Sequence, residues 1–276
     1  MTYIIVDQDR CTQCGICTTV CPLGFMSEDE EAKLPQALEK AATFCLKCGH
    51  CEAFCPTGAL TLNFALDEKS DDDVSLNDIS NDISSDLLST YLKSRRSIRC
   101  FTPQKVEKEK IEQMLEISRH AASGCNTQPV EWIVVYDEQE THKLAGLTID
   151  WIRHLYENKE PLGTALYSLV TAWDRGTDAV CCNAPHLLVA HIPENHGSGA
   201  TDGIVALTHF DIAAPAFGIG TCWAGFLTEA AKSWKPLQKE LALPQGRVIS
   251  YAMIFGYPQF KSYRTPRRNP VKIKWM

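Results

Sequence analysis

Two cysteine runs of identical spacing constrain this sequence more than any other feature. The first run, CTQCGICTTVCP, begins at residue 11, and the second, CLKCGHCEAFCP, begins at residue 45. In each run three cysteines fall within seven residues, and a fourth cysteine follows that is joined to a proline. This spacing gathers thiolates around one small object, and the proline fixes the turn by which the backbone leaves it. In a chain without an export signal, such runs predict metal ligands rather than disulfides.

The repeat resembles the two-cluster bacterial ferredoxins over residues 1–65. In the ferredoxin run the fourth cysteine ligates the other cluster. The resemblance therefore implies two 4Fe–4S clusters, one held by Cys11, Cys14, Cys17 and Cys55 and the other by Cys45, Cys48, Cys51 and Cys21. Zinc is the alternative, but zinc knuckles use two cysteines each, and the two Cys-Pro closures argue against it.

Composition divides the chain into three segments: a cysteine-rich domain at 1–65, a linker at 66–88 and a second domain at 89–276. Residues 67–86 hold eight acidic residues against one lysine and no aromatic residue, which is typical of a solvated linker. The net charge of −7 argues against binding to nucleic acid.

Hydrophobic patterns predict the elements of both domains. Residues 3–6 and 59–64 are expected to pair as short strands, and the insert 23–44 is expected to be helical with a break at Pro35. In the second domain, residues 106–122 predict an amphipathic helix with Ile111, Leu115 and Ala122 on one stripe. Strands are expected at 130–137, 186–192 and 248–257. The stretch 204–217 is apolar nearly all round, which predicts a helix buried on every side and hints at a subunit interface.

Four motifs in the second domain have the chemistry of a nucleotide-like cofactor site. RRSIRCF (95–101) supplies guanidinium groups for phosphate, and SGCNTQP (123–129) supplies amides for a heterocycle edge. GIGTCWAG (218–225) allows close backbone approach, and FGYP followed by RTPRR (264–268) adds a second source of phosphate-binding charge, which Lys261 extends. Their order and spacing resemble the flavin-dependent nitroreductase family.

The nitroreductase resemblance implies an α+β sandwich, fused behind the ferredoxin-like domain, that forms a homodimer and binds FMN at its interface. By position, Arg95, Arg96, Ser97 and Arg99 would hold the phosphate and ribityl region. Asn126 would meet the pyrimidine edge, with Ser123 and Gln128 nearby. Trp223, Ala224 and Gly225 would lie along the ring near N5, and Arg264 and Arg267 would return to the phosphate. Many family members carry a glutamate near N5 where this chain has Ala224.

The two resemblances together predict an oxidoreductase. Electrons would pass from a low-potential donor, such as a ferredoxin, through two clusters to FMN and on to a nitroaromatic, a quinone or another small acceptor. No residue is predicted to be catalytic in its own right. The alternatives are another flavin reduction, such as dehalogenation or ene reduction, and a non-catalytic redox sensor or electron carrier.

The sequence also bears on the cellular location and on the apolar window 203–227 with its few polar residues. The start, MTYIIVDQDR, lacks the features of a signal peptide, so we expect a cytoplasmic protein. The apolar window 203–227 is long enough to span a membrane, but its polar residues and prolines favour a buried helix without membrane insertion. Within it, His209 and Asp211 are expected to form a satisfied polar pair at a dimer interface rather than to be catalytic, and Cys222 is expected to be a small buried filler.

Overall fold

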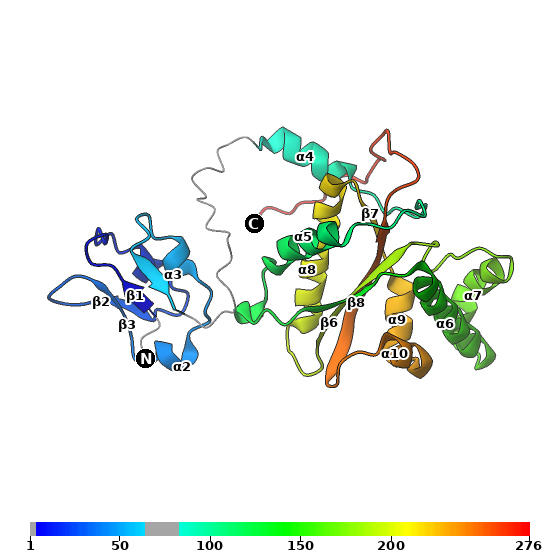
Figure 1. Cartoon of the computed structure of the whole chain (residues 1–276), viewed down its shortest axis with the longest axis horizontal. Coiled ribbons are helices and arrows are strands. Elements are labelled where there is room, and N and C mark those ends of the chain that lie inside the picture. The colour runs from blue at the N-terminus through cyan, green and yellow to red at the C-terminus, as the bar shows by residue number, and fades with distance from the viewer. Residues whose placement is uncertain (1–3, 64–82) are drawn as a thin grey trace. The chain divides into compact units, whose positions relative to one another are not determined.

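A computed structural model of the chain describes residues 4–63 and 83–276 (Figure 1). The described residues fall into two compact units, 4–63 with 125–127 and 83–124 with 128–276. Most of the predicted acidic linker lies outside the described residues. Its last residues are described, and there helix α4 (Ser85–Ser94) begins, with the Ser84 hydroxyl accepting a hydrogen bond from the amide of Leu87 at 3.1 Å.

The first unit contains the same local structure in each of its two cysteine runs. Strand β1 (Ile4–Val6) pairs antiparallel with β4 (Leu60–Leu62), which confirms the expected pairing of the segments that flank the cysteine runs. A short helix lies within each run, α1 (Ile16–Thr19) in the first and α3 (His50–Ala53) in the second. The residue before each helix is a glycine in the left-handed region.

The expected helix in the insert 23–44 is wrong. Strands β2 (Met26–Glu28) and β3 (Pro35–Ala37) pair antiparallel there, and only α2 (Ala41–Phe44) is helical. The reason is turn chemistry. The Asp29 carboxylate accepts hydrogen bonds from the amides of Glu31 (3.0 Å) and Ala32 (2.7 Å), and Lys33 adopts a φ of 53°. These contacts close a hairpin turn and override the helical propensity of the acidic run.

The second unit is built on a four-stranded antiparallel sheet in the order β5-β6-β8-β7. Strands β5 (Glu131–Val135), β6 (His186–Pro193) and β8 (Arg247–Gly256) confirm the three expected strands. Strand β7 (Gly220–Trp223) was not expected, because four residues that begin with glycine give too short a pattern.

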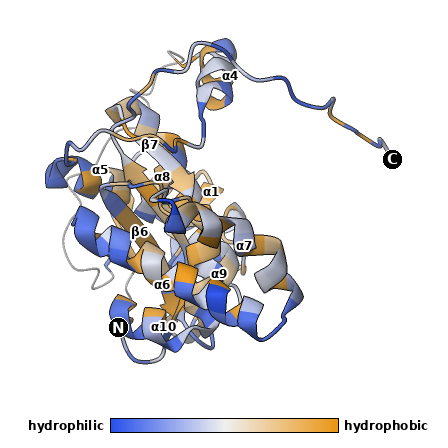
Figure 2. Cartoon of the chain, turned by 90° about the vertical axis from the view of Figure 1, so that its right-hand side faces the viewer, coloured by the Kyte–Doolittle hydropathy of each residue, from blue (hydrophilic) through white to orange (hydrophobic). Residues whose placement is uncertain are grey.

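Helices cover both faces of this sheet (Figure 1). Alternate strand residues face opposite sides. Leu188, Met253 and Phe255 join one core with α5 (Lys108–Arg119) and α8 (Gly199–Ala213), whereas Leu187 and Ile254 join the other. The second core includes residues of α6 (Glu138–Glu157), α7 (Pro161–Asp174), α9 (Gly225–Ser233) and α10 (Lys235–Leu241). Figure 2 shows hydrophilic and hydrophobic residues side by side along α6. The expected α+β sandwich is present.

Two expectations about helices need correction. Helix α5 ends at Arg119, so Ala122 lies beyond it and is exposed, and Met114 takes the buried place beside Ile111. Helix α8 is not buried all round: Leu207 and Phe210 are fully buried, but 42 % of Ile204 is exposed. Among the described residues no helix has both the length and the apolar character to cross a membrane.

Candidate cofactor sites

The eight cysteines of the two runs surround two cavities in the first unit. Their side chains surround each cavity rather than meeting at one point, and within the described part of the chain no three His, Cys, Asp or Glu side chains are spaced to hold one metal ion. Each cavity combines three cysteines of one run with the fourth of the other. The structure thus brings together the two sets expected from sequence, namely Cys11, Cys14, Cys17 and Cys55, and Cys21, Cys45, Cys48 and Cys51.

Matching turns in the two runs explain this convergence. Gln13 and Lys47, each just before the second cysteine of its run, have φ of 56° and 51°. After each Cys-Pro pair a glycine amide returns to the cysteine carbonyl, Gly24 to Cys21 at 3.1 Å and Gly58 to Cys55 at 3.2 Å. Both glycines have positive φ, of 62° and 60°, a conformation that glycine adopts without strain. The two runs therefore share the same backbone turns both before the second cysteine and after the fourth.

Backbone amides also approach the sulfur atoms. Phe25 N–H points at Cys21 Sγ (3.2 Å), and Ala59 N–H points at Cys55 Sγ (3.2 Å). Burial favours the neutral thiol of Cys55, but hydrogen bonds from neighbouring amides and from the Thr57 side chain outweigh it and lower its pKa below the ordinary value. At Cys51 burial prevails and raises the thiol pKa to about 11. Hydrogen bonds to sulfur of this kind tune the reduction potential of iron–sulfur clusters.

In the second unit a cavity contains the first two arginines of the RRSIRCF motif. Arg95 and Arg96 line it together with Gly220 of β7 and with Lys261 and Ser262 from the C-terminal segment. The Nε atom of Arg96 is buried without a hydrogen bond, and so is Nη1 of Arg95, which lies 3.4 Å from the Asp211 carboxylate. Buried guanidinium nitrogens that lack a hydrogen bond favour an anionic ligand, because leaving them unsatisfied is costly. We call this the arginine cavity.

A second cavity, of about 390 Å³, contains Arg99, Trp223 and Gly225 together with Tyr251 of β8. We call it the aromatic cavity. The rings of Trp223 and Tyr251 meet edge to face, with centroids 5.0 Å apart. Ala224 is buried, and its amide donates to the Ala252 carbonyl at 2.9 Å, so this amide is already used in the sheet. Gly225 is the first residue of α9, where amides have no partner within the helix, so its N–H is a candidate donor toward a ligand.

Ser123 and Gln128, from the SGCNTQP motif, line neither of these two cavities. Ser123 and Gln128 line a third hollow, where the Ser123 hydroxyl accepts a hydrogen bond from the Gln128 amide at 3.0 Å. Asn126 has a φ of 54°, and its side-chain amide donates to the carbonyls of Leu46 (3.3 Å) and Lys47 (2.9 Å) in the first unit. Ser123 and Gln128 therefore line a different cavity from Arg95 and Arg96.

The remaining expected residues are Ser97, Arg264 and Arg267. Ser97 forms a β-bridge with Thr221, beside the arginine cavity. Arg264 and Arg267 are exposed in the C-terminal segment, and the residues of this segment that reach the arginine cavity are Lys261 and Ser262 instead. The basic pattern of the tail gave no means of choosing among its cations.

Asp211 is a residue whose role sequence reasoning missed. The expected pair with His209 is wrong: the His209 ring contacts the Val205 carbonyl at 3.0 Å, one turn back along α8. Asp211 instead accepts hydrogen bonds from the Thr221 hydroxyl and from Trp223 Nε1 (3.2 Å), and it faces Arg95. No periodicity in the sequence links these residues, because the contacts depend on how α8 crosses β7.

Comparison with known proteins agrees with this architecture. Residues 92–257, more than half of the chain, match the nitroreductase family, and residues 10–60 match the 4Fe-4S dicluster domain. An Archaeoglobus fulgidus protein, whose name pairs NADH dehydrogenase with NAD(P)H nitroreductase, is 27 % identical over 66 % of this chain and 95 % of its own. A nitroreductase of Desulfitobacterium hafniense, solved with bound FMN, has a similar fold: the TM-score is 0.56 at 21 % identity, covering 68 % of this chain and 97 % of the other.

Proposed function

The chain belongs to the nitroreductase family, and from that premise we propose that it passes electrons through two 4Fe–4S clusters to FMN and on to a small organic acceptor. The electrons would come from a low-potential donor such as a reduced ferredoxin. Nitroaromatics and quinones are the acceptors of choice for a first test. The observation that carries the proposal is that four cysteines line each of two cavities in the first unit.

The donor set supports iron–sulfur clusters over zinc. A 4Fe–4S cluster takes four thiolates and is larger than a single ion, so its ligands surround a cavity. The amides that point at Cys21 and Cys55 would stabilise the negative charge of the bound cluster. The match of residues 10–60 to the 4Fe-4S dicluster domain supports the same reading.

The residues of the second unit fit FMN. The buried nitrogens of Arg95 and Arg96 without hydrogen bonds suit a phosphate group, and Lys261 adds positive charge on the same cavity wall. FMN, when bound, supplies the chemistry that accepts single electrons and delivers them in pairs. Trp223 and Tyr251 provide an apolar wall that orients a flat ring and excludes water. Because Ala224 stands where many family members carry a glutamate, that one position offers no acid, although Glu229 also lines the aromatic cavity; we propose that water supplies the protons.

We also propose that the working unit is a homodimer in a reducing, cytoplasmic compartment. Within one copy Ser123 and Gln128 line a different cavity from the arginines, and a second copy would supply such residues across an interface. Exposed apolar side chains on α4, among them Leu87 and Leu92, offer surface for it. Sedimentation of the flavin-loaded protein tests the homodimer. A protein that sediments as a monomer with FMN bound would contradict it.

The direct test is anaerobic purification followed by metal, sulfide and flavin analysis. We expect about eight iron atoms and about one FMN per chain, since each four-cysteine set takes one four-iron cluster. Zinc in place of iron would defeat the proposal. Turnover of a nitroaromatic or quinone with a strong reductant would support an enzyme, whereas reduction without turnover of any acceptor would favour a redox sensor or carrier.

A further inference from the structure

Asp211 joins three elements at the rim of the candidate flavin site. Its side chain is 5 % exposed and lies on α8. It accepts hydrogen bonds from the Thr221 hydroxyl and, at 3.2 Å, from the indole of Trp223. It also lies 3.4 Å from Nη1 of Arg95. A buried carboxylate is costly unless it is paired and hydrogen-bonded, and here the arginine supplies the charge and strand β7 supplies the donors.

The two donors fix where the carboxylate sits. Thr221 and Trp223 are two residues apart on β7, so their side chains leave the same face of the strand. The segment that carries Arg95 is tied to this strand as well, because Ile98 N–H donates to the Thr221 carbonyl at 2.8 Å. Asp211 therefore faces the guanidinium of Arg95 while the backbone bridge fixes the segment that carries this arginine.

This arrangement links two cavities that are otherwise lined by different residues. Arg95 faces the arginine cavity, and Trp223 faces the aromatic cavity. Asp211 contacts both residues, so a single carboxylate joins the walls of the two cavities. The other buried aspartate of α8, Asp202, has different partners: the Gly124 amide at 3.0 Å and the Ser198 hydroxyl at 2.8 Å.

We infer that Asp211 is a positioning residue that sets both the phosphate-binding Arg95 and the ring-side Trp223. The inference rests on the proposed function in taking the ligand to be FMN. Asp211 itself does not touch the cofactor; it acts by holding a guanidinium and an indole in the geometry that binding requires.

The first experiment measures FMN binding to flavin-free protein by quenching of flavin fluorescence. Asp211→Asn keeps an acceptor for the indole but removes the charge that faces Arg95, so we expect the Kd to rise about tenfold. The same substitution in an Arg95→Ala background should change the Kd little, because the partner is gone. Asp202→Asn also removes a buried charge from α8 and is the matched control. Any change that it causes in the Kd should be the same with and without Arg95.

The second experiment needs no flavin. The near-ultraviolet circular dichroism of the apoprotein reports fixed tryptophans, and the difference between wild type and Trp223→Phe isolates the signal of Trp223. Asp211→Leu removes the acceptor and should abolish that same signal, while Asp211→Asn should retain most of it. If Asp211→Asn does not fold, Thr221→Val removes one donor to the carboxylate, and a rise of about threefold in the Kd is expected.

The inference is overturned if Asp211→Asn binds FMN as wild type does, or if its loss of affinity persists in full without Arg95. A Trp223 signal that survives in Asp211→Leu would also overturn it. If wild-type protein binds no FMN, the proposed function fails instead, and the Trp223 signal still decides whether Asp211 positions the indole.

Discussion

The cysteine-rich unit and the sheet unit reach their candidate sites by different routes. In the first, six of the eight cysteines are placed by turns a few residues long, and the pairing of β1 with β4 brings the two runs together. In the second, Arg95, Asp211 and Trp223 meet only because α8 packs on β7 and the segment that carries Arg95, from much earlier in the chain, pairs with the same strand. A local motif carries its own geometry, whereas a site assembled by packing does not exist until the sheet has formed.

The largest expected effect concerns the cysteine sets. Cys48→Ser should remove one cluster, and iron should fall by about four atoms per chain, because a four-iron cluster needs four ligands. Flavin content should be unchanged, since Cys48 lies outside the unit that lines the arginine and aromatic cavities. Cys222→Ser, a buried cysteine outside both sets, is the control and should retain all iron. Iron and flavin analysis of both proteins checks this prediction. Full iron content in Cys48→Ser would contradict the role of Cys48 as a cluster ligand.

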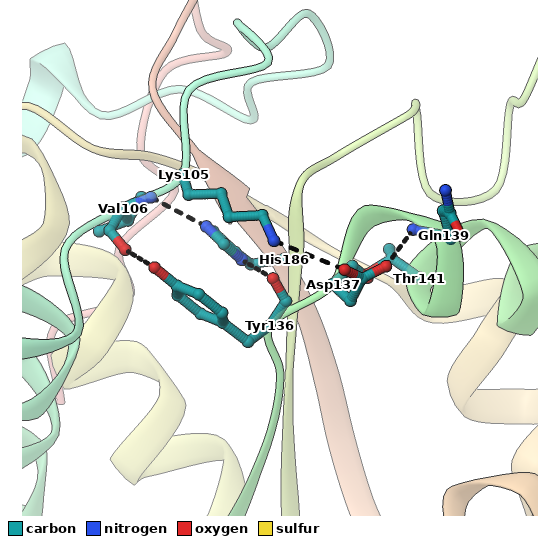
Figure 3. Close-up of polar contacts among 7 residues, drawn as sticks. All are labelled: Lys105, Val106, Tyr136, Asp137, Gln139, Thr141 and His186. Carbon is teal, nitrogen blue, oxygen red and sulfur yellow. Dashed lines mark hydrogen bonds and ion pairs between the residues drawn. The ribbon is translucent and has the colours of Figure 1, made fainter.

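The second prediction concerns the pH dependence of stability in the sheet unit. His186 is fully buried, its Nε2 accepts from the Val106 amide at 2.9 Å, and its Nδ1–H donates to the Tyr136 carbonyl (Figure 3). Burial lowers its pKa from 6.5 to about 4, the nearby charge of Lys105 adds to this, and the Tyr136 hydrogen bond opposes it.

In the unfolded chain the His186 side chain becomes protonated below pH 6.5, whereas in the folded chain it stays neutral down to about pH 4. The free energy of unfolding should therefore fall by ~3 kcal/mol as pH drops through this window and level off below it. His186→Gln should flatten that part of the profile. Denaturant titrations at several pH values measure it, and an equally steep profile in the variant would contradict the assignment.

A third, smaller effect tests how closely α8 packs on the sheet. A Cβ at Gly203 would lie 2.1 Å from Oγ of Ser250 and 2.5 Å from its Cβ, so α8 could not keep its place over β8. Gly203→Ala should lower the free energy of unfolding by about 2 kcal/mol. At Gly197 the added Cβ would meet nothing within 4 Å, so Gly197→Ala is the control. Equal stability of the two variants would show that packing at this crossing is looser than described.

The smallest expected effect concerns the contribution of Arg96 to FMN binding. Arg96→Ala should raise the Kd for FMN about tenfold, because one charge-assisted contact to phosphate is lost. Arg153→Ala removes an arginine that is ion-paired with Asp150 and Asp174 on the surface and should leave the Kd unchanged. Flavin titration distinguishes them, and similar affinities in both variants would place the phosphate elsewhere.

These contrasts explain what could be predicted from the sequence. Strands β5, β6 and β8 follow from β-rich runs, and the grouping of the cysteines follows from the resemblance of the two runs to those of two-cluster ferredoxins. The hairpin at Asp29 was missed because its side chain closes a turn that propensity alone would make helical. The contacts of Asp211 were missed because they join residues from three elements, and no short-range pattern records such a crossing. The domain limits at 65 and 89 and the roles of the FMN-binding residues stay predictions.

The central claim is that electrons delivered to the clusters reach FMN. It is tested most directly by following flavin absorbance while the anaerobic holoprotein is mixed with a photoreduced ferredoxin, in wild type and in Cys48→Ser. The account predicts that wild-type flavin takes up about two electrons and bleaches, whereas flavin in Cys48→Ser is reduced far more slowly. Flavin reduction at the same rate in both proteins would show that the cysteine-rich unit is not the route, and would contradict the account.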